Sequence, residues 1–266
     1  MGHCTPAVPQ SGTAALPPVG APPAAARSGP ENAADTVFDP RLMAQKRRTE
    51  LISEHGGMTT SRILIDRLEL LARDGRDGYA WEGDAWFGGD YDKLWLKTEG
   101  EGEVGAPLEA AEVQALWSRA ILPFFDFQLG VRHDVRPRPD RTHLAVGIQG
   151  LAPYWFEIDA AAFLSTKGDL TARFEAEYDQ RITYRLFIQP RVEFDLAAQD
   201  VPELGVGSGL SSAELGLRLR YQFVPEFSPY IGVGYERFFG DTARFARADG
   251  EDVGGWSLLL GLRAWF

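Results

Sequence analysis

Hydrophobic and polar residues alternate with a period of two over most of this chain. The segment 256–266 shows the pattern well, because every second residue from Trp256 to Phe266 is apolar, whereas Ser257 and Arg263 fall between them. Successive side chains of a β-strand point to opposite faces of a sheet. The segment is therefore predicted to be a strand with one apolar face and one mixed face.

About twelve segments of this kind follow one another to the end of the chain. In one of them, Leu170 and Phe174 lie on one face, while Arg173 and Glu175 lie on the other. The predicted strands span residues 62–72, 78–88, 92–101, 109–119, 124–134, 141–150, 154–165, 169–179, 182–196, 211–223, 229–240 and 255–266.

The two faces of these strands differ in chemistry. The apolar face is continuous over about ten residues, the length that a tilted strand needs to cross the hydrocarbon of a membrane. The other face carries charges of both signs at the strand centres. A soluble sandwich would bury the apolar face between two sheets, whereas a membrane barrel would turn it to lipid and enclose the charges. Alternation alone leaves both architectures open.

The links between the strands favour the membrane barrel. After the first link, short links such as 88–91 and 151–153 alternate with longer ones such as 197–210 and 241–254. An even number of strands also brings both ends of the barrel to the side of the tight turns. This layout is typical of outer-membrane barrels, with short periplasmic turns and longer external loops. We therefore predict an all-β fold, a transmembrane antiparallel up-and-down β-barrel, with a soluble β domain as the alternative.

The first 60 residues differ in composition from the rest of the chain. Their first part is rich in Pro, Ala and Gly and buries little apolar surface, so it is expected to be a disordered leader. Asp39 and Pro40 are residue types that begin a helix, and Gly56 is one that ends it, so a short helix is expected within residues 40–55. The predicted domains are the leader, residues 1–60, and the barrel, residues 61–266.

Charge and composition exclude several classes of protein. The net charge of −11 argues against nucleic acid as a partner, because phosphate binding needs clustered Lys and Arg. The single cysteine, Cys4, allows no intrachain disulfide. No stretch approaches the ~20 apolar residues of a transmembrane helix. No signal peptide is visible at the start, so for an exported protein we expect the printed sequence to begin after the signal or at an internal Met.

A long segment of the sequence resembles a known family. Residues 88–101 read Gly-Gly-Asp-Tyr-Asp-Lys-Leu-Trp-Leu-Lys-Thr-Glu-Gly-Glu, which is a specific pattern. With the segments 66–69, 116–120, 123–126, 128–132 and 150–160, it resembles the copper resistance protein B family (CopB, PcoB) in matching order over about residues 60–266.

The resemblance implies an outer-membrane barrel of a Gram-negative bacterium that contributes to copper resistance and homeostasis, by binding copper ions or by passing them across the outer membrane. It also implies a periplasmic copper protein as a partner. Family members usually carry a Met- and His-rich leader, whereas this chain has only three Met and four His, so high-capacity copper sequestration is not carried over. Two alternatives stay open: a general small-solute porin, and a structural barrel that scaffolds a periplasmic partner.

The remaining expectations about partners follow from the barrel. We expect a monomer in contact with outer-membrane lipid. The terminal Phe266 is the expected signal for the outer-membrane assembly machinery, which reads an aromatic residue at the end of the last strand. The sequence has no Walker loop, no Cys-x-x-Cys pair, no His-Glu-x-x-His motif and no His beside a plausible nucleophilic Ser, so we expect no enzymatic activity.

Candidate copper ligands lie in or next to the leader. Met1, His3 and Cys4 offer soft ligands suited to Cu(I), with an inert start of the chain as the alternative. His55 and Met58 flank two glycines and are close enough in sequence to share an ion, with a solvated helix end as the alternative. Further along, His143 is predicted to face inward and His133 outward, so joint binding of one ion is not expected.

Alternation also predicts which charged side chains the barrel encloses. A charge inside a narrow barrel must be paired or hydrated. We expect a cross-strand salt-bridge network for most of these residues, with surplus carboxylates that attract cations. Carboxylates are hard ligands, so they would guide copper rather than select it. The predicted inward-facing residues are Glu69, Glu82, Asp84, Lys93, Lys97, Asp126, Arg132, Glu157, Asp159, Arg173, Glu175, Glu177, Arg185, Arg191, Glu193, Arg218 and Arg220.

Overall fold

The computed structural model describes residue 29, residues 32–51 and residues 57–266, and it divides the chain into two compact units, Met1–Gly56 and Gly57–Phe266. The rest of the predicted leader lies outside the described residues. The first unit contains η2 (Ala33–Thr36), α1 (Pro40–Lys46) and the π-helical turn η3 (Arg47–Leu51). The Asp39 carboxylate begins α1 by accepting a hydrogen bond from the Arg41 backbone N–H at 2.8 Å.

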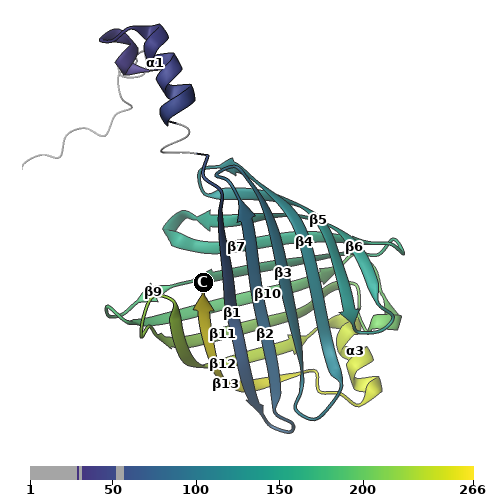
Figure 1. Ribbon diagram of the computed structural model, residues 1–266. Helices are drawn as coiled ribbons and strands as arrows, with labels where there is room; N and C mark the ends of the chain where they lie inside the picture. Colours follow the sequence, from purple (N-terminus) through teal and green to yellow (C-terminus); the bar gives the residue numbers. More distant parts are fainter. Residues whose placement is uncertain (1–28, 30–31, 52–56) are drawn as a thin grey trace, which may run out of the picture. The chain divides into compact units, whose positions relative to one another are not determined.

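The second unit is a closed antiparallel barrel (Figure 1). Consecutive long strands pair, and β13 also pairs with β1, so twelve long strands form a ring, while the two-residue β9 pairs only with β10. The predicted barrel of about twelve strands is confirmed. The strands are β1 (Thr60–Arg73), β2 (Gly78–Gly88), β3 (Asp92–Glu103), β4 (Leu108–Leu122), β5 (Phe125–Arg136), β6 (Arg141–Ala152), β7 (Phe156–Ser165), β8 (Leu170–Tyr178), β9 (Gln180–Arg181), β10 (Leu186–Ala197), β11 (Gly209–Tyr221), β12 (Phe227–Phe238) and β13 (Gly254–Trp265).

The apolar face of each strand points outward and the polar face points inward. Leu70 and Leu260 on the outer face are 57% and 58% exposed, whereas Glu69 and Leu259, their neighbours in sequence, are 3% and 4% exposed. A continuous apolar belt of this kind is the surface that a bilayer covers. Within the described part of the chain, no helix is long and apolar enough to cross a membrane.

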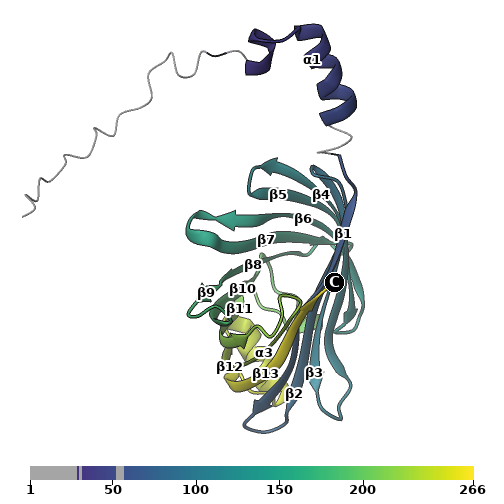
Figure 2. The same ribbon diagram turned by 60° about the vertical axis from the view of Figure 1, so that its left-hand side comes forward.

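Both ends of the barrel lie at the rim of the short turns, which we call the periplasmic rim. Ile63 in β1 and Phe266 exchange backbone hydrogen bonds of 3.0 and 2.9 Å. Figure 2 shows the C-terminus beside β1 and the tilt of the strands around the barrel. The Phe266 side chain is 74% exposed. Its role as an assembly signal stays a prediction.

The ninth predicted strand, 182–196, begins too early. β10 starts at Leu186, and the preceding residues form an exposed turn. The Ile182 and Thr183 N–H groups both donate to the Leu186 carbonyl, at 2.9 and 3.1 Å, and the Thr183 hydroxyl accepts from the Leu186 N–H at 3.1 Å. A threonine side chain that bonds its own backbone competes with the sheet ladder. The alternation seen at Ile182 and Tyr184 therefore belongs to a turn.

The link predicted over 241–254 contains a helix, α3 (Gly240–Asp249), at the rim opposite the termini. Ala243 and Ala246 are buried on one side of α3, and the Thr242 hydroxyl accepts a hydrogen bond of 2.8 Å from the Gly207 N–H in the β10–β11 loop. Gly250 ends the helix in a left-handed conformation. The two longest loops at this rim thus pack against each other.

Candidate functional site in the barrel lumen

The inner face carries a connected network of arginines and carboxylates near the strand centres. Arg67 in β1 is buried, and its guanidinium lies 2.7 Å from Glu82, 3.6 Å from Glu99 and 3.6 Å from Glu214. Glu82 and Glu99 lie on the next two strands, but Glu214 comes from β11, on the other side of β12 and β13. One side chain therefore links strands from both sides of the barrel closure.

Arg191 in β10 continues the network from the opposite wall. Its guanidinium contacts Glu175 at 2.6 Å, Glu193 at 2.8 Å and Glu82 at 3.3 Å. Glu175 and Glu193 belong to adjacent strands, whereas Glu82 lies across the lumen in β2. Since Glu82 also binds Arg67, both arginines share one carboxylate.

Arg173 in β8 makes the second crossing of the lumen. Its guanidinium lies 2.5 Å from Glu99 in β3 and 3.4 Å from Glu112 in β4, and its Nε lies 3.2 Å from Glu193 and from Asp195 in β10. These crossings make the middle of the barrel a layer of ion pairs. The layer holds more carboxylates than guanidinium groups.

The network extends from Glu112 toward the external rim. Arg132 contacts Glu112 at 2.7 Å and Asp134 at 2.6 Å, and the His143 Nε2 lies 3.0 Å from the other Asp134 oxygen. His143 is 5% exposed and faces inward, as predicted. His133 is instead held by the Thr142 hydroxyl at 2.9 Å on the outer face, so the two histidines do not share a site.

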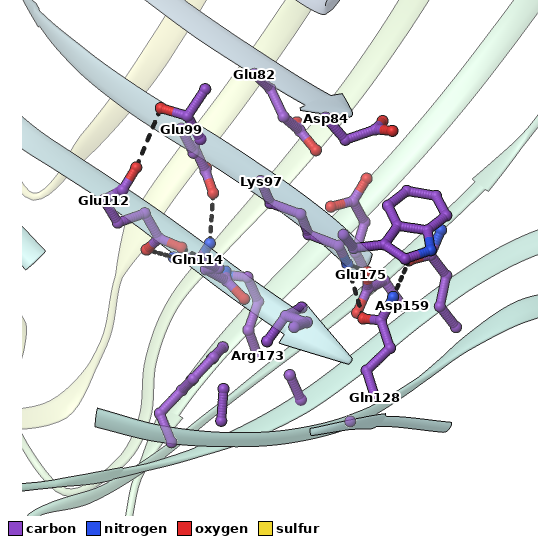
Figure 3. Close-up of a pocket in the computed structure, with 18 of the residues that line it drawn as sticks. Glu82, Asp84, Lys97, Glu99, Glu112, Gln114, Gln128, Asp159, Arg173 and Glu175 are labelled. Carbon is purple, nitrogen blue, oxygen red and sulfur yellow. Dashed lines mark hydrogen bonds and ion pairs between the residues drawn. The ribbon is translucent and has the colours of Figure 1, made fainter. Parts of the chain in front are cut away.

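A cavity of about 110 Å³ lies beside this layer (Figure 3). One side is apolar, with Trp95, Leu116, Ala145 and Phe163 packed together. The polar lining is unbalanced, because it contains six carboxylates and two basic groups, although Arg67, Arg132 and Arg191 pair with some of these carboxylates from outside the lining. The carboxylates are Glu82, Asp84, Glu99, Glu112, Asp159 and Glu175, and the basic residues are Lys97 and Arg173.

The Lys97 ammonium crosses the lumen to reach one of these carboxylates. Its Nζ lies 2.5 Å from Asp159 Oδ2 in β7 and 3.1 Å from Gln128 Oε1 in β5. Figure 3 shows Lys97, Asp159 and Gln128 converging from separate strands. The Lys97 Nζ also lies 5.8 Å from the ring centroid of Trp95.

A bulge in β1 brings further charges into the lumen. The register of β1 shifts between Ile65 and Arg67 against β2, which inserts one extra residue at Asp66. Asp66 and Arg67 are adjacent in sequence, yet both have partners inside the barrel. Asp66 lies 3.0 Å from the Arg263 guanidinium, which also lies 3.8 Å from Glu177.

Other predicted residues form separate pairs along the wall. Arg218 contacts Glu69 at 2.7 Å, and the Lys93 Nζ lies 3.5 Å from Asp126. Arg220 contacts Asp179. Arg62 pairs with the predicted Asp84 at 3.4 Å. Glu157 is exposed at the periplasmic rim, opposite Glu177 on the neighbouring strand.

The prediction that Arg185 faces the lumen is wrong. Arg185 lies in the exposed turn before β10, and its backbone carbonyl accepts from the Gln222 N–H at 2.7 Å. Sequence reasoning also missed several residues of the network. Alternation could have found Arg67, Glu99 and Glu214, because each shares a face with a predicted residue of the same strand. No residue of the predicted strand 109–119 was placed inward, so Glu112 was missed, and no alternation signal marks the bulged Asp66.

The predicted metal ligands are only partly within the structure. Met1, His3, Cys4 and His55 lie outside the described residues. Met58 is described and is 62% exposed. Among residue 29, residues 32–51 and residues 57–266, no group of three or more His, Cys, Asp or Glu side chains is arranged to hold a metal ion.

At the external rim, Glu203 ties three loops together. Its carboxylate lies 2.8 Å from Arg141 at the start of β6 and 3.0 Å from the Lys167 Nζ in the β7–β8 turn. The hydrogen bond and charge of Lys167, followed by those of Arg141, lower the pKa of Glu203 below its ordinary value. Arg141 also contacts Asp169, so the β10–β11 loop is joined to the β7–β8 turn.

The fold has counterparts among solved structures. The NanC porin superposes with a TM-score of 0.52 at 12% identity, over 74% of this chain and 98% of the porin. The closed barrel, its apolar outer belt and its charged interior define an outer-membrane β-barrel protein, and the protein is located in the outer membrane.

The sequence comparisons give the family. The family model described as copper resistance protein B precursor (CopB) matches residues 59–266. The chain is 44% identical over 204 residues to copper resistance protein B of Escherichia coli, covering 77% of this chain and 69% of that protein. It is 43% identical over 212 residues to the copper resistance protein B homolog of Pseudomonas syringae pv. tomato, covering 80% and 72%. The chain belongs to the copper resistance protein B family, so the resemblance seen in the sequence is confirmed.

Proposed function

We propose that this barrel contributes to copper resistance by taking copper ions into its acidic lumen and passing them across the outer membrane. The observation that carries the proposal is the unbalanced cavity lining, in which six carboxylates face Lys97 and Arg173. Clefts lined by one sign of charge concentrate counter-ions. Because carboxylates are hard ligands and copper is softer, this charge supplies attraction rather than retention, which suits passage.

In this proposal the leader, residues 1–60, binds copper ions. Met1, His3, Cys4, His55 and Met58 offer softer ligands than the lumen, so they would hold copper more tightly than the lumen does. A periplasmic copper protein would exchange ions with them. The barrel would work as a monomer without a catalytic step.

Copper flux into vesicles tests the proposal. The full chain is inserted into liposomes that contain a copper-sensitive fluorophore, and Cu(I) or Cu(II) is added outside. Copper entry without entry of uncharged solutes of similar size supports the proposal. Equal passage of salts and small solutes would instead identify a general porin. A barrel that passes neither, but binds a periplasmic partner through its leader, would identify a scaffold.

A second measurement separates the leader from the lumen. The matched variant carries His3→Ala, Cys4→Ser, His55→Ala and Met58→Leu in the full chain, which leaves the barrel charges unchanged. Weaker Cu(I) binding by this variant supports the capture role. Equal Cu(I) binding by both forms removes the leader from the proposal and leaves the lumen as the site of interaction.

A further inference from the structure

The Lys97 ammonium lies among the kinds of donor that bind a small cation. The Asp159 carboxylate is 2.5 Å away, the Gln128 side-chain carbonyl oxygen is 3.1 Å away, and the Trp95 ring centroid is 5.8 Å away. A carboxylate, an amide oxygen and an aromatic face each attract a positive charge. In this structure the Lys97 ammonium therefore lies in the position that a bound cation would take.

The donors are fixed by contacts that do not involve the lysine. Gln128 is 3% exposed, and its Nε2 donates to the Gln149 Oε1 at 3.0 Å, which turns the Gln128 oxygen toward the ammonium. Trp95 is 6% exposed and packs against Leu116 and Phe163. Asp159 lies on β7, which is paired on both sides. A site whose walls are held in this way stays in place when its occupant leaves.

Space and access are present beside the ammonium. The cavity of about 110 Å³ adjoins Lys97, Trp95, Asp159 and Gln128. The Trp95 Nε1–H is buried and meets no acceptor in the described part of the chain, so it remains available to a ligand or to the hydration shell of one. The Asp159 side chain is 33% exposed to the lumen, so an arriving ion reaches it without unfolding the wall.

We propose that the Lys97 ammonium is a tethered, displaceable occupant of a binding site for a monovalent cation, formed by Asp159, Gln128 and Trp95. A monovalent ion that replaces the ammonium puts the same single positive charge beside Asp159, whereas a divalent ion puts one more there. The aromatic face favours a soft, weakly hydrated ion over a hard one. The identity of the ion as Cu(I) rests on the proposed function; the site itself does not.

The site differs from a storage site in one respect. It offers a single carboxylate, which agrees with the finding that no chelating group of three is formed by the described residues. The lysine remains attached by its flexible stem and returns when the ion moves on. Competition between the two cations keeps the affinity of the wild-type lumen low, as a conduit requires.

The test compares two lysine variants of the refolded full chain. Ag(I), a monovalent ion that neither disproportionates nor oxidises in air, is titrated into the wild type, Lys97→Met and Lys93→Met, and binding is followed by calorimetry. Lys93 is a matched control, because it lies on the same strand and inner face, pairs with Asp126 at 3.5 Å and stands 5.9 Å from the Trp86 ring centroid. Both variants remove one lumen charge.

We expect Lys97→Met to bind Ag(I) about tenfold more tightly than the wild type, and Lys93→Met to stay within about twofold of it. Adding Asp159→Asn to Lys97→Met should abolish the gain. An equal gain of Ag(I) affinity in both lysine variants would show that only the total charge of the lumen matters, which would contradict the proposed site. No gain of affinity in Lys97→Met would also contradict it. Heat-modifiable migration in gels checks that each variant is folded.

The outcomes separate this site from the proposed function. A wild-type barrel that fails to pass copper, with a gain of Ag(I) affinity in Lys97→Met, keeps the site and removes copper as its ion. Copper flux in the wild type, with no gain in Lys97→Met, keeps the passage of copper and removes the site.

Discussion

Arg218 and Glu69 form the most deeply buried ion pair of the described residues, with 2.7 Å between Nε and Oε1 and side-chain exposures of 2% and 1%. Arg218 lies on β11 and Glu69 on β1, with β12 and β13 between them in the ring. The Arg218 guanidinium also stands 5.9 Å from the ring centroid of Tyr230 on β12. The pair therefore fastens the last strands of the chain to the first across the closure of the barrel.

Removing one member of this pair should destabilise the barrel strongly. Arg218→Met leaves the Glu69 carboxylate buried without its partner, a change that costs about 3–5 kcal/mol. The double variant Arg218→Met with Glu69→Leu should recover much of that loss, because no charge remains buried. Urea unfolding in lipid vesicles measures both. Arg119→Met is the control: it breaks an exposed pair with Asp92 and should cost at most about 1 kcal/mol. A loss no larger in Arg218→Met than in this control would contradict the prediction.

Strands β4 and β5 approach closely at Gly130, so a side chain at this position should destabilise the barrel. A Cβ on Gly130 would lie 2.0 Å from the Ala115 carbonyl oxygen, so the two strands would have to separate. Gly130→Ala should lower the free energy of unfolding by about 1–3 kcal/mol, the usual cost of overpacking. Gly255→Ala on β13 meets no atom within 4 Å and should have little effect. The urea concentrations at the unfolding midpoints of the two variants test this, and equal midpoints would contradict the prediction.

Alternation predicted the barrel well because each strand has one face in lipid and one in the lumen, so the period of two survives along almost every strand. The alternation pattern gave a wrong prediction where the backbone hydrogen bonds join residues close in sequence instead of neighbouring strands. The turn around Thr183 keeps an alternating sequence but bonds to itself, and α3 occupies a segment that reads as a loop. In β1, the bulge at Asp66 places two successive residues inward, which no strict period can anticipate.

The sequence predicted which way a charged side chain faces better than it predicted the ion-pair partner of that side chain. The inward direction of Arg173 follows from alternation, but its contact with Glu99 depends on the strand tilt and on five intervening strand steps around the ring. Lys97 and Asp159 meet for the same geometric reason. The sequence gives the charged residues on the inner face of each strand, whereas the diameter and stagger of the closed barrel decide which of them come into contact.

A charge on the lipid face should be tolerated only near the rims. Leu260, at the middle of β13, is 58% exposed on the outer face, and Leu260→Arg should destabilise the inserted barrel by about 2–4 kcal/mol. Trp256 is close to the external rim on the same face, and Trp256→Arg should cost at most about 1 kcal/mol as a charge effect. Unfolding in vesicles supplies the comparison. Equal losses at the two positions would contradict the placement of the apolar belt in the bilayer.

Acid should release the external loop that Glu203 holds. Lys167 and Arg141 lower the pKa of Glu203, so the folded loop binds its proton less readily than the unfolded loop does. The resulting stabilisation is complete above the ordinary pKa of a glutamate and disappears as the pH falls through the lowered value. A spin label at Leu204→Cys, in a Cys4→Ser background, should therefore report a fixed loop at neutral pH and a mobile loop in strong acid. Glu203→Gln should make the label mobile at all pH values. A pH-dependent transition that survives in Glu203→Gln would contradict the prediction.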